Sequence, residues 1–263
     1  MIRYNTLIVE QIENVGVIRL NRPETLNAAT PEMFDEIRLA AEYLRDDGAR
    51  ALLLTGEGKG FCSGADLSVK NFGNASPGST ARKGLQSHYN PGMNALNALD
   101  IPIVCAVNGP AAGIGCALAL AGDIIFASKS AYFLQAFANI GLVPDGGSTW
   151  LLPRSISMPD ALELMLTGER LYAERAEQIG LINRCVADEH LFDEALAMAK
   201  RLASGPTVAL GMIRQLVRGA QHMSMTEAMN LEAEAQKRAG DSDDFLEGIA
   251  AFKEKRKPKF QGR

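Results

Sequence analysis

Short apolar runs alternate with helix-like segments over the first two hundred residues. Buried strands are predicted at residues 7–9, 15–20, 51–55, 103–107, 123–127 and 181–186. Apolar residues recur at helical spacing between them, at residues 30–47, 148–152, 161–166, 173–179 and 189–203. After Pro206 only helices are predicted, at residues 207–218, 226–239 and 242–255. This order favours an α/β fold with a largely parallel sheet, followed by a helical appendage.

Two segments interrupt the regular pattern. Residues Lys70 to Thr80 are rich in Gly, Ser, Asn and Pro, and they predict a loop. Residues 82–99 have a helical pattern but contain Pro91-Gly92, so a break in the helix is expected there.

The stretch from Ile103 to Asp123 is the one around which the chain is organised. An apolar run ends in Asn108-Gly109-Pro110, small residues follow as far as Gly115, and an Ala/Leu-rich segment continues to Gly122. The pattern predicts a buried strand, a tight turn and a buried helix. Because the turn has almost no side chains, its backbone N–H groups could hold an anion or an oxygen that becomes anionic during a reaction.

Composition narrows the class of protein. The formal net charge of −4 argues against a nucleic-acid binder. We expect no membrane span, since no apolar run approaches the roughly 20 residues that a span requires. The four cysteines form no C-x-x-C pair and resemble reduced core residues, and no signal-peptide pattern opens the chain. The expected location is therefore cytoplasmic.

Several common cofactor-binding and catalytic motifs are incomplete in this sequence. Gly113-Ile114-Gly115 follows a strand, but Leu118 stands where a dinucleotide fingerprint needs its third glycine. Residues 56–60 lack the spacing of a P-loop, and Ser63 is not in a G-x-S-x-G context. The three histidines lie far apart without metal-ligand spacing, so no metal site is expected.

Asp145 allows two interpretations. It stands in Val143-Pro144-Asp145-Gly146-Gly147, just before the helix predicted from Ser148. It could cap that helix, since Asp-Gly turns are common. Alternatively, it could be a carboxylate in an apolar pocket whose raised pKa lets it move protons. The sequence pattern alone does not separate these interpretations.

Three motifs in order give the chain a family resemblance. They are residues 60–67 (GFCSGADL), 108–115 (NGPAAGIG) and 141–147 (GLVPDGG). Together they resemble the crotonase (enoyl-CoA hydratase/isomerase) superfamily, and the resemblance extends to the tail at residues 252–260. Residues 106–154 most resemble isomerases of the superfamily that open a ring in phenylacetate degradation.

The resemblance implies an overall architecture. The expected fold is α/β, a crotonase (ClpP-like) spiral of ββα units with a C-terminal helical trimerisation region. The spiral core with the acyl-CoA site would span residues 1–200, and the helical oligomerisation region would span residues 201–263. The implied assembly is a homotrimer or a dimer of trimers. The implied ligand is an acyl-CoA thioester, with coenzyme A as part of the substrate and no separate cofactor or metal.

The resemblance also assigns roles to residues. The backbone N–H groups of Ala65 and Ile114 would hold the thioester oxygen as it becomes an enolate, and Asp145 would be the acid. Residues implied to contact the acyl-CoA are Ala28, Asp66, Leu67, Phe137, Phe252 and Lys255, the last two sometimes from a neighbouring subunit. Lys255 could equally be one of several solvated charges in the tail.

Two departures from the family pattern indicate the reaction. Hydratases of the superfamily place two glutamates around a water, whereas this chain has Ala117 and Phe137 at those positions. One carboxylate suits a proton shuttle from C2 to C4. Hydration is harder with a single carboxylate, because the same group must then activate the water and protonate the carbon. An acyl-CoA isomerase is therefore the first hypothesis. A hydratase that uses Asp145 and an ordered water is the second, and a non-catalytic acyl-CoA-binding scaffold is an alternative of another class.

Overall fold

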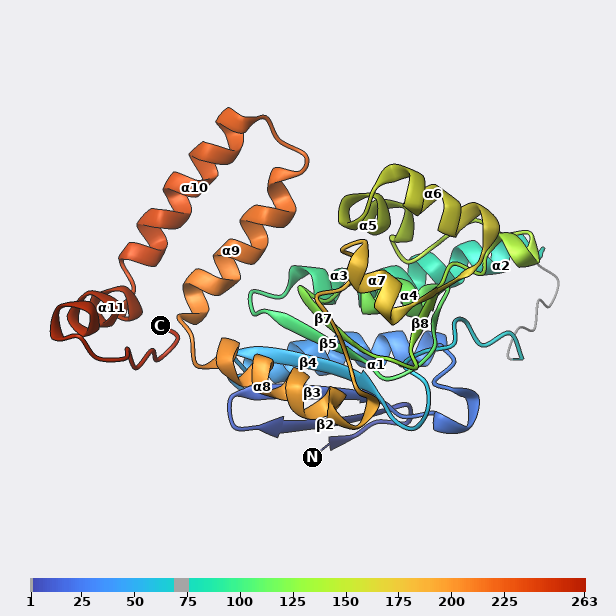
Figure 1. Cartoon of the computed structure of the whole chain (residues 1–263), viewed down its shortest axis with the longest axis horizontal. Helices are drawn as coiled ribbons and strands as arrows, with labels where there is room; N and C mark the ends of the chain where they lie inside the picture. Colours follow the sequence, from blue (N-terminus) through green and yellow to red (C-terminus); the bar gives the residue numbers. More distant parts are fainter. Residues whose placement is uncertain (1, 69–75) are drawn as a thin grey trace.

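The computed structural model describes residues 2–68 and 76–263, and its centre is a mostly parallel sheet (Figure 1). The strand order is β1-β2-β3-β4-β5-β7-β10. The antiparallel strands β1 to β3 form one edge, and the pairs from β3 to β10 are parallel. The strand bounds are β1 Ile2–Arg3, β2 Leu7–Ile12, β3 Val15–Leu20, β4 Ala51–Gly56, β5 Ile103–Val107, β7 Ile124–Ser128 and β10 Arg184–Val186.

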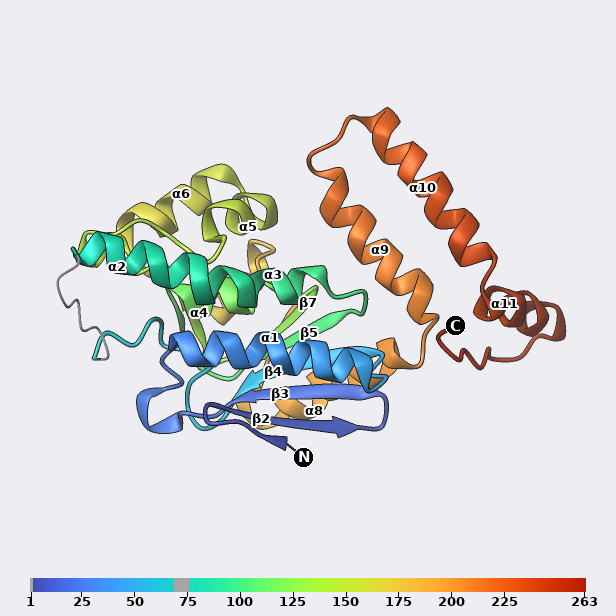
Figure 2. The same ribbon diagram turned by 180° about the vertical axis from the view of Figure 1, so that it is seen from behind.

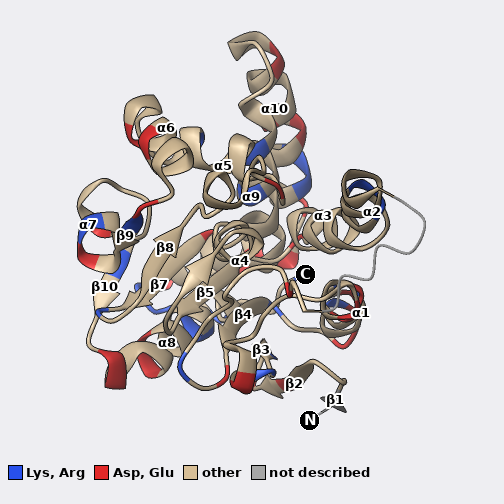
Figure 3. Cartoon of the chain, turned by 90° about the vertical axis from the view of Figure 1, so that its right-hand side faces the viewer, with Lys and Arg blue, Asp and Glu red and all other residues tan. Residues whose placement is uncertain are grey.

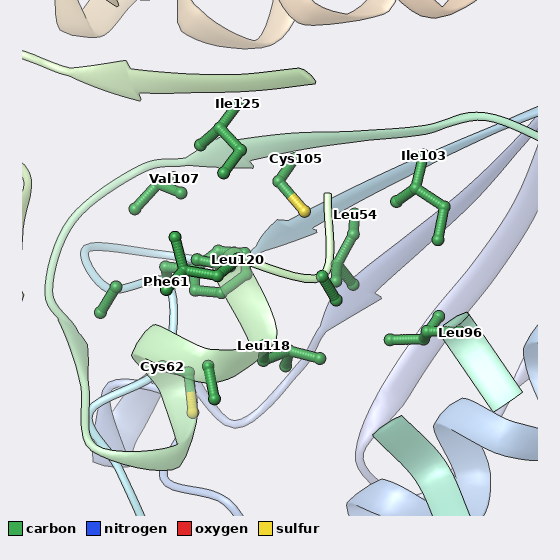
Figure 4. Close-up of a cluster of buried hydrophobic side chains, with 14 of the residues drawn as sticks. Leu54, Phe61, Cys62, Leu96, Ile103, Cys105, Val107, Leu118, Leu120 and Ile125 are labelled. Atoms are coloured by element: carbon green, nitrogen blue, oxygen red, sulfur yellow. The ribbon is translucent and has the colours of Figure 1, made fainter. Parts of the chain in front are cut away.

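The central strands are apolar along their whole length because both faces of the sheet are covered. In β4, Leu52 and Leu54 belong to one hydrophobic cluster, while Ala51 and Leu53 belong to the cluster on the opposite face. Figure 4 shows part of the first cluster, in which Leu54, Cys105 and Leu118 gather between the sheet and its helices.

Helices α1 (Pro31–Asp46) and α3 (Asn90–Ala98) cover one face of the sheet, and α8 (Leu191–Ala203) covers the other (Figures 1 and 2). Helix α1 begins where the sequence pattern predicts, because the Thr30 side chain accepts a hydrogen bond from Met33 N–H and Pro31 occupies the first turn. Its face buries Phe34 and Ile37 against the sheet.

A second, three-stranded sheet adjoins the small-residue turn. It consists of β6 (Ala111–Ala112), β8 (Tyr132–Leu134) and β9 (Arg170–Tyr172) in the order β6-β8-β9. The short helix α4 (Ile114–Ala119) follows β6 directly. Around this sheet lie α5 (Ser148–Ser155), α6 (Met158–Thr167) and α7 (Ala173–Gln178). The predicted order of strand, tight turn and buried helix at residues 103–122 is confirmed.

The C-terminal helices project from the rest of the molecule (Figure 1). They are α9 (Thr207–Ala220), α10 (Met225–Gly240) and α11 (Asp243–Glu254), each within a few residues of its predicted range. The helical appendage is thus confirmed, while a domain boundary at residue 200 stays a prediction.

The structure corrects the prediction for the segment before β5. Residues 70–75 of the predicted loop lie outside the described residues, but Pro77 to Thr80 are helical, in α2 (Pro77–Gly84). No break occurs at Pro91-Gly92 either. A π-helical turn, Leu85–Tyr89, joins α2 to α3, so Pro91 falls in the first turn of α3, where a proline is tolerated.

Candidate active site

Three segments far apart in the sequence are paired at the small-residue turn. Cys62 forms a parallel bridge with Ala111, in which Ala112 N–H donates to the Cys62 carbonyl at 2.9 Å. Ala29 forms a second parallel bridge with Ala65. These bridges place the loop at residues 61–67 between residues 28–29 and the start of α4.

Two backbone amides beside these bridges, the N–H groups of Ala65 and Ile114, are the ones expected to hold the thioester oxygen. The backbone of Ala29 forms hydrogen bonds with Gly64 and with Asp66, the two residues on either side of Ala65. The N–H of Ala65 itself therefore points away from Ala29. Ile114 is the first residue of α4, and its N–H therefore has no acceptor within the helix. Gly64 and Gly113, which precede these residues, are close, since a Cβ on Gly113 would lie 3.9 Å from Gly64 Cα. The two amides therefore lie on adjoining segments.

Asp145 lies against the same helix. It belongs to a turn in which Gly146 and Gly147 both have positive φ, at 61° and 84°. A Cβ on Gly146 would approach Ile114 Cδ1 to 2.2 Å and Ala117 Cβ to 2.9 Å. Only glycine permits this packing, which brings the backbone of the Asp145 turn onto the side chains at the start of α4.

The carboxylate of Asp145 does not cap helix α5. Gly147 occupies the N-cap position, and no side chain there caps the helix by a hydrogen bond. Ser148 N–H donates instead to the backbone carbonyl of Asp145, at 3.0 Å. The Oδ1 atom of Asp145 is buried. Of the two interpretations of Asp145, side-chain capping of α5 is therefore wrong, and one carboxylate oxygen is buried while the residue as a whole is partly exposed.

Apolar side chains surround these groups. The ring of Phe137 would lie 3.5 Å from a Cβ on Gly113, and Phe137 is only 7% exposed. Helix α4 and β8 carry no charged residue, and both are uncharged in Figure 3. Burial raises the pKa of the Cys62 thiol to about 11, so Cys62 stays protonated near neutral pH. Helix α4 and β8 thus add no charge beside the turn that carries Asp145.

An ion pair fastens the proposed substrate-binding loop. Arg22 donates to the Ala28 carbonyl at 2.5 Å and to the Asp66 carboxylate at 2.9 Å. Hydrogen bonds from the Ser68 hydroxyl and from Arg22 hold the pKa of Asp66 below its usual range, although burial opposes them. The Asp66 side chain is therefore committed to the loop itself, as are the Ala28 carbonyl, which accepts from Arg22, and the Asp66 N–H, which donates to the Ala29 carbonyl. Leu67, in the same loop, is 55% exposed.

Two of the predicted contact residues lie far from this cluster within the chain. Phe252 is in α11 and Lys255 is its C-cap, and α11 lies at the opposite end of the molecule from α4 (Figures 1 and 2). Phe252 is 86% exposed. The structure thus brings Ala28, Ala65, Asp66, Leu67, Ile114, Phe137 and Asp145 together, but not Phe252 and Lys255.

Tyr89 belongs to the cluster although the sequence pattern did not single it out. Its hydroxyl lies 3.4 Å from the carbonyl oxygen of Ala29, the bridge partner of Ala65. Burial, together with the negative charge of Asp145, raises the pKa of Tyr89 to about 12. The only signal in the sequence was an aromatic residue two positions before Pro91, which the helical pattern does not distinguish from a core residue.

The described residues contain neither a cluster of metal-binding side chains nor a helix that could span a membrane. In residues 2–68 and 76–263, no three His, Cys, Asp or Glu side chains gather as a metal site would require. No helix in the same ranges combines the length and hydropathy of a membrane span.

Comparison with known proteins gives a consistent picture. Residues 10–263 match the family model of enoyl-CoA hydratase/isomerase. The chain is 43% identical over 258 residues to the 1,2-epoxyphenylacetyl-CoA isomerase of Escherichia coli, covering 97% of this chain and 98% of that protein. It is 36% identical to the mitochondrial enoyl-CoA hydratase of Pongo abelii, covering 94% and 83%. The crystal structure of an enoyl-CoA hydratase subunit I from Geobacillus kaustophilus superposes with a TM-score of 0.91 at 37% identity, covering 99% of both chains.

Proposed function

The chain belongs to the enoyl-CoA hydratase/isomerase family, and we propose that, within this family of enzymes, it is an isomerase of acyl-CoA thioesters. The reaction would be a double-bond shift or a ring isomerisation next to the thioester. The observation that carries the proposal is the partly buried carboxylate of Asp145, whose Oδ1 atom is buried and whose neighbour Gly146 packs on Ile114 and Ala117. Ala117 and Phe137 stand where the hydratases of the family have glutamates, so Asp145 is the acid that remains.

The proposed mechanism uses two backbone amides and one carboxylate. The amides of Ala65 and Ile114 would hold the thioester oxygen, and they would stabilise it most as it becomes an enolate oxygen. Asp145 would take a proton from C2 and return it at C4, so that the proton count of the product equals that of the substrate. Neither a metal nor a separate cofactor takes part in this scheme.

The backbone of Ala28 and Asp66 would bind the coenzyme A part of the substrate. Arg22 holds this loop in place through the Ala28 carbonyl and the Asp66 carboxylate, and Leu67 of the same loop is 55% exposed. Phe252 and Lys255 would reach the nucleotide end of a substrate in a neighbouring copy, within a trimer or a dimer of trimers.

A ring isomerisation has specific support from one relative. The Escherichia coli protein, at 43% identity, is named as an isomerase of 1,2-epoxyphenylacetyl-CoA. Hydratase names among the relatives support the alternative, in which Asp145 activates an ordered water. A substrate comparison separates the two. Incubation with crotonyl-CoA and with a 3-enoyl-CoA should give isomerisation of the second and little hydration of the first, whereas strong hydration without isomerisation would favour the hydratase.

The variant Asp145→Asn tests the role of the acid. It keeps the shape of the side chain but removes the base, and general acid–base catalysis typically contributes about 10²- to 10⁴-fold. We expect kcat for isomerisation to fall by about that factor while acyl-CoA binding, measured by calorimetry, is retained. Asp46→Asn, in an exposed pair with Arg45 at the end of α1, is the matched control and should keep its activity. Unchanged turnover in Asp145→Asn would remove Asp145 from catalysis, and a wild type that binds acyl-CoA without turnover would indicate a scaffold.

A further inference from the structure

Tyr89 is held in a defined position by its own π-helical turn and by two contacts with α1. It ends the π-helical turn between α2 and α3, and such turns occur often at functional sites. His88, its neighbour, pairs with Asp35 of α1 at 2.7 Å between Nδ1 and Oδ2. The ring of Tyr89 packs edge-on against Phe34 of α1, with the ring centroids 4.9 Å apart. The side chain is therefore fixed by packing, and its hydroxyl is directed at Ala29.

The hydroxyl of Tyr89 has a weak partner in the protein. Its distance of 3.4 Å to the Ala29 carbonyl oxygen is at the long limit of a hydrogen bond. The same carbonyl already accepts the N–H of Asp66 at 2.8 Å. Among the described residues this long contact is the hydrogen bond of the hydroxyl, and a half-buried hydroxyl so placed can take a better acceptor if a ligand brings one.

The surrounding charges keep this hydroxyl a donor. The charged or ionisable groups acting on it are the carboxylates of Asp145 and Asp66 and the thiol of Cys62. All of these oppose the loss of its proton, and the pKa of about 12 leaves Tyr89 protonated at any physiological pH. An O–H donor thus stands beside the Ala29–Ala65 bridge, within the electrostatic range of Asp145.

We infer that Tyr89 is a specificity-determining residue whose hydroxyl donates a hydrogen bond to an oxygen atom carried by the acyl group of the substrate. The inference rests on the proposed function, because it takes the thioester oxygen to lie at Ala65 and the reacting carbons to lie at Asp145. An acyl group with an epoxide, ether or hydroxyl oxygen near C3 or C4 would provide the Tyr89 hydroxyl with a hydrogen-bond acceptor. A plain alkenyl chain leaves the hydroxyl with its long contact to Ala29.

Binding of two matched ligands tests this inference without turnover. The ligands are 2-methoxyphenylacetyl-CoA and 2-ethylphenylacetyl-CoA, which have similar shape and differ by an ether oxygen in place of a methylene. The methoxy oxygen accepts a hydrogen bond and cannot donate one to Asp145. Calorimetry of the wild type and of Tyr89→Phe should show that the ratio of affinities, methoxy over ethyl, falls about threefold to tenfold when the hydroxyl is removed.

The control variant is Tyr43→Phe, which removes an exposed hydroxyl on α1 and should leave the ratio unchanged. An equal ratio in wild type and Tyr89→Phe overturns the role of Tyr89 while leaving the acyl-CoA site intact. If the wild type binds neither ligand, the proposed acyl-CoA site is itself wrong and the inference falls with it. If Tyr89→Phe keeps the ratio but shifts the pH profile of kcat, Tyr89 acts on Asp145 rather than on substrate, and the inference is also overturned.

Discussion

Ile114 contributes to the candidate site through both its backbone and its side chain. Its N–H opens helix α4, and its Cδ1 atom lies where a Cβ on Gly146 would have to be. One residue therefore connects the proposed oxyanion donor to the turn that carries Asp145. The side chain matters for position, whereas the N–H matters for the chemistry, and the two can be separated by substitution.

Replacing Ile114 by proline removes the donor at a position where helices tolerate proline. No intrahelical bond is lost, since the first N–H of a helix has no acceptor within it. We expect kcat to fall about 10²- to 10³-fold, the usual loss for one oxyanion donor. Ile114→Ala, which keeps the N–H but shortens the side chain, is the comparison and should lose less than about tenfold. Steady-state kinetics with one acyl-CoA substrate measures both variants, and equal losses would contradict the role of the amide.

At the scale of elements, the acidic residue Asp123 fastens helix α9 to the core. It follows α4, and its carboxylate accepts hydrogen bonds from Arg214 at 2.7 Å and from Arg218 at 2.8 Å. Arg214 is 6% exposed and also donates to the carbonyls of Leu96 and Leu99 at the end of α3. One buried cation thus joins three elements, and α9 is the first helix of the projecting C-terminal region.

Removing the charge of Asp123 should therefore destabilise the fold. Asp123→Asn leaves the buried Arg214 without its counter-ion, and breaking a buried ion pair costs about 3–5 kcal/mol, less where an acceptor is retained. We expect the free energy of unfolding in urea to fall by about 2–4 kcal/mol. Asp241→Asn, in an exposed pair with Lys237 on α10, is the matched control and should change it by less than about 0.5 kcal/mol. Similar losses in the two variants, at equal protein concentration, would show that the Asp123 pair has no special role.

Element order was more predictable from the sequence than the details of the site. Periodicity placed β4 and β5 because both faces of these strands are buried, and Thr30-Pro31 placed the start of α1 because capping is local. The pattern around Pro91 misled, since a π-helical turn moved this proline into the first turn of a new helix. Tyr89 was missed for the same reason: its approach to Ala29 depends on that turn and on α1, neither of which is local to the residue.

At the scale of the whole molecule, the question is whether α11 contributes to the acyl-CoA site of its own chain or to that of a neighbouring copy. Phe252 is 86% exposed, and Phe245 and Leu246 of the same helix are 51% and 63% exposed. An exposed apolar patch is typical of a surface that contacts another molecule. Its distance from α4 within the chain agrees with a role in a neighbouring copy (Figure 2). In a head-to-tail ring, each site would combine Asp145 of one chain with Phe252 and Lys255 of the next. Such an assembly should have a mass three or six times the 28.3 kDa of the chain.

Mixed assemblies of two impaired variants test this arrangement. One variant is Asp145→Asn, and the other is the double variant Phe252→Ala, Lys255→Ala, which should raise KM without changing kcat. When the two are co-expressed with different tags and purified through both tags, sites that combine an intact Asp145 with an intact α11 should form. In a trimer purified through both tags, about one site in three would be of this kind, and in a dimer of trimers about one in four, so activity at low substrate should rise above that of either variant alone. If each α11 instead served the site of its own chain, no intact site could form, and the mixture would show only the average of the two parent activities.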